Sequence, residues 1–401
     1  TVRYGAMIDI GSGSVLVAIV KSDSAKSYPE IVWAKRVYTP LRQGKNLEDS
    51  AKNVMASLVT ALMSLDSEGR KVFSDTTGKS RLPEAQVTIA APWSYTITKN
   101  ISYGHAEDFT VSDELVEELL RTAHQKVEED LKEHERVNEL GLSVITRSVI
   151  GLQANGYTLL NTNNQQAKSL RVAEASAVAQ DYLIKALHDA TEKVLPEATV
   201  RMYSFILIYF YILRDLHPDL QEFCLIDITY EATEIGIVRE GILSYTTHTP
   251  AGAFSLARQI AEILDIPTEE AYGYLHNAEP LTLLAHYSEE KQVQVKQVLT
   301  TYQKSLEDLL KETGDSLAIP KKIYLHGNLE TEKFFAEQVG NAAKTVTRSA
   351  HALYPISQKI ISEHYNKESE AGLKKATEDT ALLISAQFFH MVEYQNKFEH
   401  L

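Results

Sequence analysis

The sequence predicts an α/β protein of two related domains, with an extra subdomain inserted in the first. The 401 residues exceed what one hydrophobic core usually serves. One pattern also occurs twice: a buried strand carries an aspartate at its end, a tight turn follows and a second strand returns. Asp9 ends the first copy and Asp227 the second, which suggests duplication of one α/β unit. A change of pattern after Trp93 predicts the insertion, at residues 93–177.

Composition and charge exclude some classes of function. The net charge of -14 argues against nucleic acid as a partner, because phosphate backbones are bound by clusters of lysine and arginine. Cys224 is the only cysteine, so an intrachain disulfide and a thiolate metal site are excluded and the cytosol is the expected compartment. The most apolar run, SFILIYFYIL from Ser204, spans about ten residues, whereas a membrane-spanning helix needs roughly 20. We expect it in a domain core.

The remaining elements follow from periodicity and turn signals. Apolar residues at steps of three and four predict a helix over residues 46–65, and QVTIAAP predicts a buried strand over residues 86–92. Within the insertion, Asn155-Gly156 predicts a tight hairpin turn. A third strand over residues 323–325 is followed by a turn at Gly327 and a helix from about Thr331, and the last helix is expected over residues 378–401.

The first turn has the residue types of a phosphate site. Gly11, Ser12, Gly13 and Ser14 allow the backbone N–H groups to approach an anion closely, and two hydroxyls add donors. Asp9 beside this turn is suited to a hydrated Mg²⁺ ion, which binds a carboxylate together with waters and phosphate oxygens. An ordinary hairpin turn is the alternative interpretation.

The order of these motifs resembles the actin-like ATPases. DIGSGS at residues 9–14, the second aspartate turn with TPAGAF at residues 249–254, and LHGN at residues 325–328 are similar to the phosphate-one, phosphate-two and adenosine motifs of that family. The insertion lies where the FtsA-like and PilM-like members carry an extra subdomain. The resemblance implies a duplicated, ribonuclease H-like two-domain ATPase fold with an FtsA-type insertion.

The resemblance also implies the limits of the domains. The first domain would comprise residues 1–92 and 178–221 with the C-terminal helix of residues 378–401. The inserted subdomain would be residues 93–177. The second domain would be residues 222–377, with an outer lobe at about residues 240–316.

The resemblance implies ATP and Mg²⁺ as ligands. Asp9 and Asp227 would face the magnesium ion and its waters, and would be the weak catalytic candidates, while Gly11 to Ser14 would bind phosphates. Further nucleotide-binding positions would be Thr233, Gly252 at the start of a helix, and Gly327.

The second loop departs from the family pattern. Glycines of the usual DIGGGTTD are replaced by Thr229, Tyr230 and Glu231, so bulk and negative charge are added near a triphosphate. At most a slow ATPase is expected.

We expect an FtsA-like cell-division scaffold that self-associates as a filament or dimer and binds a tubulin-like division protein through the outer lobe. It would lie in the cytoplasm at the inner face of the cell membrane. Membrane-binding tails of such proteins are basic and amphipathic, but ISAQFFHMVEYQNKFEHL is poor in lysine and arginine and predicts a packed core helix. Membrane contact would be indirect, or through a tail missing from this chain.

Two alternatives remain open. A PilM-like platform of type IV pilus assembly would bind the cytoplasmic peptide of an inner-membrane pilus protein in a groove of the inserted subdomain. A small-molecule kinase on the same core would need a carboxylate base and an intact phosphate site, and the altered second loop argues against it.

Overall fold

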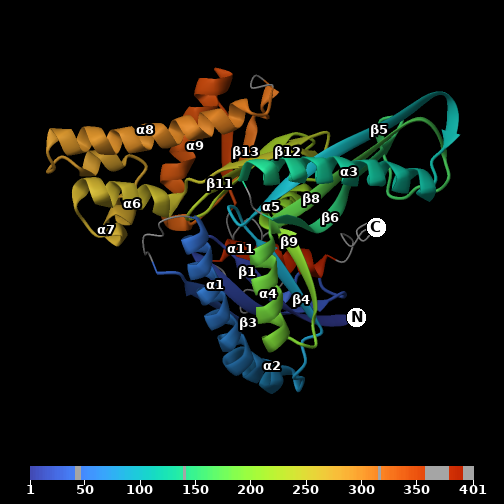
Figure 1. The fold of residues 1–401 in the computed structure, drawn as a ribbon, viewed down its shortest axis with the longest axis horizontal. Coiled ribbons are helices and arrows are strands. Elements are labelled where there is room, and N and C mark those ends of the chain that lie inside the picture. The colour runs from blue at the N-terminus through green and yellow to red at the C-terminus, as the bar shows by residue number, and fades with distance from the viewer. Residues whose placement is uncertain (41–46, 139–140, 315–317, 357–378, 392–401) are drawn as a thin grey trace.

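Two sheets with the same topology form the centre of the molecule (Figure 1). The computed structural model describes the chain except residues 41–46, 139–140, 315–317, 357–378 and 392–401. The first sheet has the order β3-β2-β1-β4-β9 and the second the order β12-β11-β10-β13-β14. In each, three antiparallel strands continue into two parallel ones. The predicted duplication of an α/β unit is therefore confirmed.

Helices cover both faces of the first sheet. One face packs against α1, and the other packs against α11. Burial on both sides explains why β1 and β2 are almost continuously apolar instead of alternating. The strands of this sheet are β1 (Val2–Ile10), β2 (Ser14–Asp23), β3 (Glu30–Tyr38), β4 (Glu84–Ile89) and β9 (Thr199–Ser204). The helices of this domain are α1 (Leu47–Ser64), α2 (Arg70–Thr77), α4 (Asp181–Val194), α5 (Phe205–Leu216) and α11 (Thr380–His390), with a π-helical segment at Leu65–Gly69.

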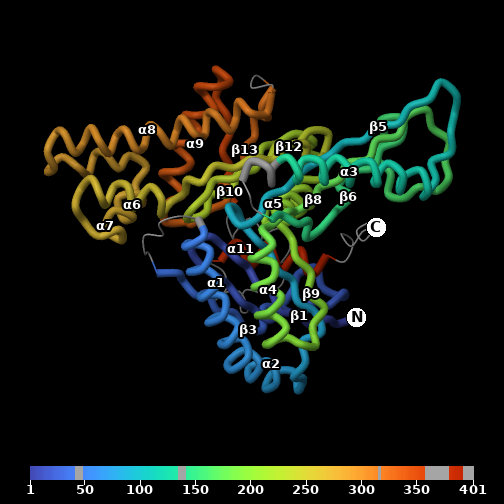
Figure 2. The backbone as a smooth tube through the Cα atoms, in the orientation of Figure 1, coloured from blue at the N-terminus to red at the C-terminus, as the bar shows by residue number. Residues whose placement is uncertain are grey.

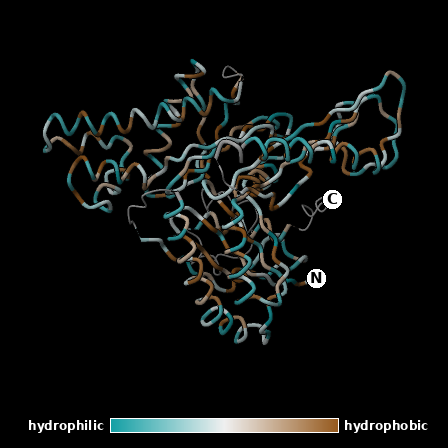
Figure 3. Tube along the Cα trace, in the orientation of Figure 1, coloured by the Kyte–Doolittle hydropathy of each residue, from teal (hydrophilic) through white to brown (hydrophobic). Residues whose placement is uncertain are grey.

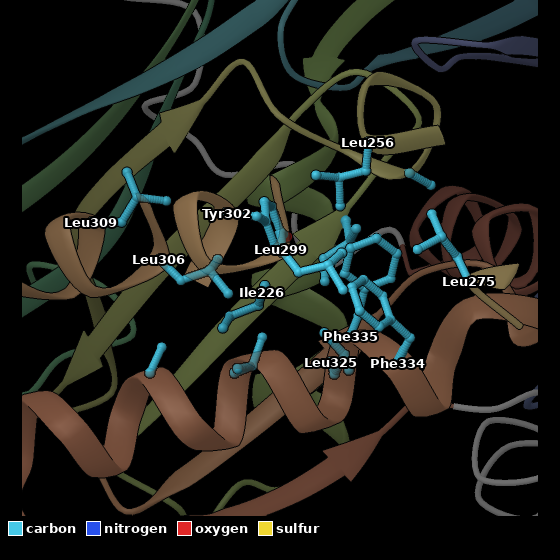
Figure 4. Close-up of a cluster of buried hydrophobic side chains, with 14 of the residues drawn as sticks. Ile226, Leu256, Leu275, Leu299, Tyr302, Leu306, Leu309, Leu325, Phe334 and Phe335 are labelled. Carbon is cyan, nitrogen blue, oxygen red and sulfur yellow. The ribbon is translucent and has the colours of Figure 1, made fainter. Parts of the chain in front are cut away.

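The second sheet has its own core under helices α6, α8 and α9. Figure 4 shows this cluster, in which Ile226 and Leu325 of the sheet meet Leu299 and Tyr302 of α8 and Phe334 of α9. The strands are β10 (Phe223–Ile228), β11 (Thr233–Arg239), β12 (Ile242–Thr249), β13 (Lys322–His326) and β14 (Ala352–Pro355). The helices are α6 (Ala253–Leu264), α7 (Thr268–Tyr274), α8 (Glu289–Lys311) and α9 (Glu332–Thr347), with 3-10 turns at Pro280–Leu283 and Leu329–Thr331. The range expected for the outer lobe includes β12, which instead pairs with β11 in the sheet.

The inserted subdomain is a separate four-stranded sheet with one long helix. Its strand order is β5-β8-β6-β7, and the chain leaves the first domain after β4 and returns at α4 (Figure 2). The predicted hairpin turn is confirmed, with φ of 49° at Asn155 and 81° at Gly156. The elements are β5 (Ser94–Thr110), α3 (Asp113–Asn138), β6 (Leu142–Ala154), β7 (Tyr157–Thr158) and β8 (Gln166–Gln180).

This subdomain contacts both domains. Thr246 of β12 donates a hydrogen bond to the Thr96 carbonyl at 2.6 Å, and Thr98 donates to the Ser244 carbonyl at 2.9 Å. Thr146 of β6 donates to the Met202 carbonyl of β9 in the first domain. The insertion is therefore fixed against both sheets.

Helix α5 joins the two domains at the centre of the molecule. The apolar run predicted for a domain core forms this helix, and its residues from Phe205 to Leu213 are all buried. Figure 3 shows hydrophobic segments gathered in the centre of the molecule. The same cluster includes Phe223 and Tyr324 of the second sheet and Phe388 of α11. None of the described helices is long and apolar enough to cross a membrane.

The C-terminal helix packs in the core, as its composition predicts. Only Thr380–His390 of the expected range is helix α11, and residues 392–401 lie outside the described part. Phe388 packs on Tyr203 at 5.1 Å and on Tyr211 at 5.6 Å between ring centroids. We infer that α11 is a structural part of the first domain.

Shortening Phe388 to alanine should therefore lower the free energy of unfolding by about 3–5 kcal/mol, because a large buried ring is removed. Urea unfolding of the whole chain measures the loss. The control is Met63→Ala on α1, where the side chain is 64% exposed and a change within about 0.5 kcal/mol is expected. Equal stabilities of the two variants would contradict the packing of α11.

Candidate ligand cleft

The two repeated aspartates lie at corresponding positions of the two sheets. Asp9 of β1 is opposite Thr88 on the parallel strand β4, and Asp227 of β10 is opposite His326 on β13. Thr88 Oγ1 donates to Asp9 Oδ1 at 3.2 Å, and His326 Nδ1 donates to Asp227 Oδ1 at 2.8 Å. Both carboxylates line one cleft of about 690 Å³ between the domains.

The two turns beside these aspartates touch each other directly. The Glu231 N–H donates to Ser12 Oγ at 2.9 Å. The ring of Tyr230 lies on Gly13, where an added Cβ would be 2.7 Å from Tyr230 Cγ. The first turn is also held from behind, because Trp93 Nε1 donates to the Gly11 carbonyl at 2.9 Å. Residues 230–231 therefore lie directly against Ser12 and Gly13 of the first turn.

The N-terminus of α6 is capped by the second turn. The N–H of Ala253 donates to the Thr229 carbonyl at 3.1 Å, and the N–H of Phe254 donates to the Tyr230 carbonyl at 2.8 Å. At Gly252, an added Cβ would be 2.8 Å from the Ala232 nitrogen, so glycine is needed for this close packing. The donors predicted to bind an anion at Gly252 are already used inside the protein.

The acidic residue of the second turn is also paired internally. Arg258 of α6 forms two hydrogen bonds to the Glu231 carboxylate, at 2.6 Å and 2.5 Å. A bidentate pair of this kind fixes both side chains. The neighbouring Tyr230 stacks on Phe254 with ring centroids 3.8 Å apart. The second turn is therefore anchored to its own helix.

Arg36 of β3 occupies the centre of the first domain's side of the cleft. Its guanidinium is 3.3 Å from Asp9 Oδ2 and donates to Ser14 Oγ at 2.7 Å. It also donates twice to Asp379, at 2.7 Å and 2.9 Å. Asp379 in turn accepts the Leu382 N–H at the start of α11. Arg36 thus links two acidic residues and a hydroxyl of the predicted phosphate turn.

The pKa values of the cleft acids follow from burial and from this arginine. Burial raises the pKa of Asp9, although Arg36 opposes the shift. Burial also acts to raise the pKa of Asp379, but the ion pair with Arg36 and the Leu382 N–H outweigh it, so the pKa is lowered. Glu234 of β11 pairs with Asp227 behind the cleft, and burial together with Asp227 holds the pKa of Glu234 well above its ordinary value.

These groups do not fit Mg²⁺ with a triphosphate, the ligand that the fold implies. Arg36 occupies the place beside Asp9 expected for a cation, and the Tyr230 ring lies on Gly13 of the phosphate turn. Among the described residues that line the cleft, Arg36 is the only lysine or arginine, against five acidic residues, namely Asp9, Asp227, Glu269, Glu330 and Asp379. A triphosphate would therefore meet an acidic surface, and the start of α6 is already capped by the second turn.

The predicted site residues are only partly brought together. Of the predicted site residues, those that line the cleft are Asp9, Gly11, Ser12, Ser14, Asp227 and Gly327. Gly13 lies beneath Tyr230 and Gly252 beneath the second turn. Thr233 is fully buried, and its hydroxyl bonds the Ala251 carbonyl at 2.8 Å and the Tyr302 hydroxyl at 2.7 Å.

Sequence reasoning missed Arg36 and Asp379. The register contains a signal for Arg36, because Leu16 pairs with Asp9 on one side and with Arg36 on the other. Directly opposite residues point to the same face of a sheet, so a correct register for β3 would have placed Arg36 beside Asp9. Asp379 is far away in the sequence and has no such signal.

The duplicated sheets, the cleft between them and the placement of the inserted sheet define the actin-like ATPase fold. No family model matches the sequence, and no curated protein matches it. Among solved structures, one of a "PilM-PilN type IV pilus biogenesis complex" matches with a TM-score of 0.56 and 14% identity, covering 97% of this chain and 98% of that chain.

Two further structures are similar over most of their length. The ethanolamine utilization protein EutJ from Carboxydothermus hydrogenoformans has a TM-score of 0.46 and 12% identity, covering 96% of this chain and 90% of that one. A Bacteroides thetaiotaomicron protein with an actin-like ATPase fold and unknown function has a TM-score of 0.40 and 12% identity, covering 88% and 91%.

The contact between Tyr230 and Gly13 can be tested by a double-mutant cycle. Gly13→Ala should lower the free energy of unfolding by about 1–3 kcal/mol, because the new methyl group overlaps the Tyr230 ring. In a Tyr230→Ala background the same change should cost much less. Chemical denaturation of the four proteins measures the coupling.

The matched control is Gly273→Ala on α7, where an added Cβ meets no atom within 4 Å. That substitution should be neutral or slightly stabilising, since alanine is the better helix former. A Gly13→Ala penalty that is the same with and without the Tyr230 ring would show that the ring does not cover the turn.

Proposed function

We propose that the chain is a PilM-like scaffold that binds an extended segment of another protein in a groove between the first domain and the inserted subdomain. ATP turnover is not part of this function. The observation that carries the proposal is the groove itself, of about 820 Å³, which is lined by β6, α4 and β9. The contacts at the first turn support it, because Tyr230 lies on Gly13 and the Glu231 N–H bonds Ser12 where the resemblance predicts phosphates.

Two strand edges face this groove. Within the described residues, β9 pairs only with β4, and the first half of β6 pairs only with β8. Residues 142–147 of β6 are half-buried, as are Val200 and Arg201 of β9. The Met202 carbonyl on the β9 edge already accepts a hydrogen bond from Thr146. Other backbone groups of a strand edge can accept an added strand, and a groove beside it gives pockets for side chains. The geometry favours an extended peptide over a helix.

The charge of the groove favours an acidic peptide. Arg147, Lys185 and Arg201 line it, and among the described residues that line it Asp181 is the one carboxylate. Within the described residues, neither Lys185 nor Arg201 forms an ion pair, whereas the Asp181 carboxylate accepts a hydrogen bond from Ser143. Unpaired cations beside a groove attract a partner of opposite charge.

The similarity to a solved structure also supports a segment of another protein as the partner. The similar solved structure is named as a complex of PilM with PilN. For this chain we propose the cytoplasmic segment of a membrane protein as the occupant, so that the protein would act at the inner face of the membrane. A cell-division scaffold that binds a tubulin-like protein, and self-association, stay predictions.

The kinase alternative loses support from the second turn. A kinase needs an intact phosphate site and a carboxylate free to accept a proton. Glu231 is held by Arg258, and the N–H groups at the start of α6 bond the turn. Both requirements are therefore unmet at this turn.

Peptides selected from a random 12-residue display library on the whole chain should be extended and acidic. Replacing both Lys185 and Arg201 by glutamate should weaken the binding of a selected peptide at least about tenfold, because two attractive charges become repulsive. Fluorescence anisotropy with a labelled peptide measures the dissociation constant, and added salt should weaken binding to the unmodified protein.

Lys296→Glu is the matched control, since this exposed lysine lies on α8, away from the groove (Figure 1). It should leave the dissociation constant within about twofold. Selected peptides without acidic residues, or equal binding to the double variant and the control, would contradict the assignment of the groove.

A further inference from the structure

We propose that Arg36 is a built-in substitute for the divalent cation of this cleft, and that the chain holds its two domains closed without nucleotide. The inference concerns the cleft and is independent of the peptide groove. Three of the groups involved were expected from the sequence to face Mg²⁺ and phosphate, namely Asp9, Ser12 and Ser14.

The position of the guanidinium is set by the sheet. Arg36 shares a row with Leu16 and Asp9 across three paired strands, so its side chain rises on the same face as the Asp9 carboxylate. It reaches Asp9 Oδ2 at 3.3 Å and Ser14 Oγ at 2.7 Å. A metal ion in a phosphate site would use the same two kinds of oxygen.

The charge balance requires a cation at this point. Asp9 is 4% exposed, and buried carboxylates are strongly destabilising unless they are paired and hydrogen-bonded. Arginine is permanently protonated and presents a planar fork that suits a carboxylate. Here the Arg36 guanidinium donates two hydrogen bonds to the Asp379 carboxylate and a third to Asp9.

Contacts between the two turns take the place of the phosphates. In a nucleotide-bound cleft, the two turns would be joined through the ligand. In this structure they are joined by the hydrogen bond from the Glu231 N–H to Ser12 and by the Tyr230 ring on Gly13. Asp379 then connects the arginine to the start of α11, whose far side packs in the interdomain core around α5. The cleft therefore contains internal replacements for the cation and for the phosphates that would join the two turns.

The test compares Arg36→Ala with Arg36→Lys in the full chain, by thermal unfolding with and without MgCl₂ at matched ionic strength. Arg36→Ala should lower the melting temperature by at least about 4 °C, because Asp9 and Asp379 are left without a counter-charge. Several millimolar Mg²⁺ should restore a large part of that loss. The unmodified protein should not respond to Mg²⁺, since its cation position is filled.

Two further variants separate this idea from a general loss of packing. Adding Asp379→Ala to Arg36→Ala removes one of the two acidic groups, so the rescue by Mg²⁺ should disappear. Lys35→Ala on the same strand removes only an exposed pair with Glu68 and should behave as the unmodified protein does. If Arg36→Ala does not fold, the test uses Arg36→Lys instead. That variant should be less stable than the unmodified protein, and Mg²⁺ should not change its melting temperature.

The proposal is overturned by either of two results. One is stabilisation of the unmodified protein by Mg²⁺ to the same degree as Arg36→Ala, which would mean that the cation position is open. The other is an Arg36 variant as stable as Lys35→Ala, which would mean that the guanidinium has no structural role in the cleft.

Discussion

A positive charge between buried carboxylates is the constraint on which the interior of this molecule depends. The duplicated fold places an aspartate at the end of the central strand of each sheet, so a closed cleft collects negative charge. His326 is hydrogen-bonded to Asp227, while Arg36 is shared between Asp9 and Asp379. With that charge supplied from β3, the two turns can meet directly.

The direct meeting of the turns explains residues that otherwise look like the remains of a nucleotide site. Gly13 and Gly252 are needed because the second turn packs on them, at distances that leave no room for a side chain. Tyr230 and Glu231 fill space and form bonds inside the protein, through Phe254 and Arg258. The same residue types therefore serve packing where the family pattern predicts phosphate binding.

Much of the fold could be predicted from the sequence, because its signals are local. The paired strands around Asp9 and Asp227, the Asn155-Gly156 turn and the buried run at α5 follow from apolar patterns and turn residues alone. The residues of the cleft were harder to predict from the sequence. Thr233 matches a family motif but faces the core, where its hydroxyl forms a hydrogen bond with the Tyr302 hydroxyl. Arg36 and Asp379 come from β3 and the start of α11, and their meeting with Asp9 depends on tertiary packing. The groove likewise joins elements about 60 residues apart, β6 and β9, which no local pattern connects.

Titration calorimetry of magnesium ATP into the unmodified full chain tests the central claim most directly. The claim is that the protein's own groups occupy the nucleotide position. We therefore expect no saturable heat at nucleotide concentrations up to about 1 mM, which corresponds to a free energy of binding weaker than about -4 kcal/mol. Stoichiometric binding in the micromolar range would contradict the claim, because Tyr230 and Arg36 would then have to leave the cleft to admit the ligand.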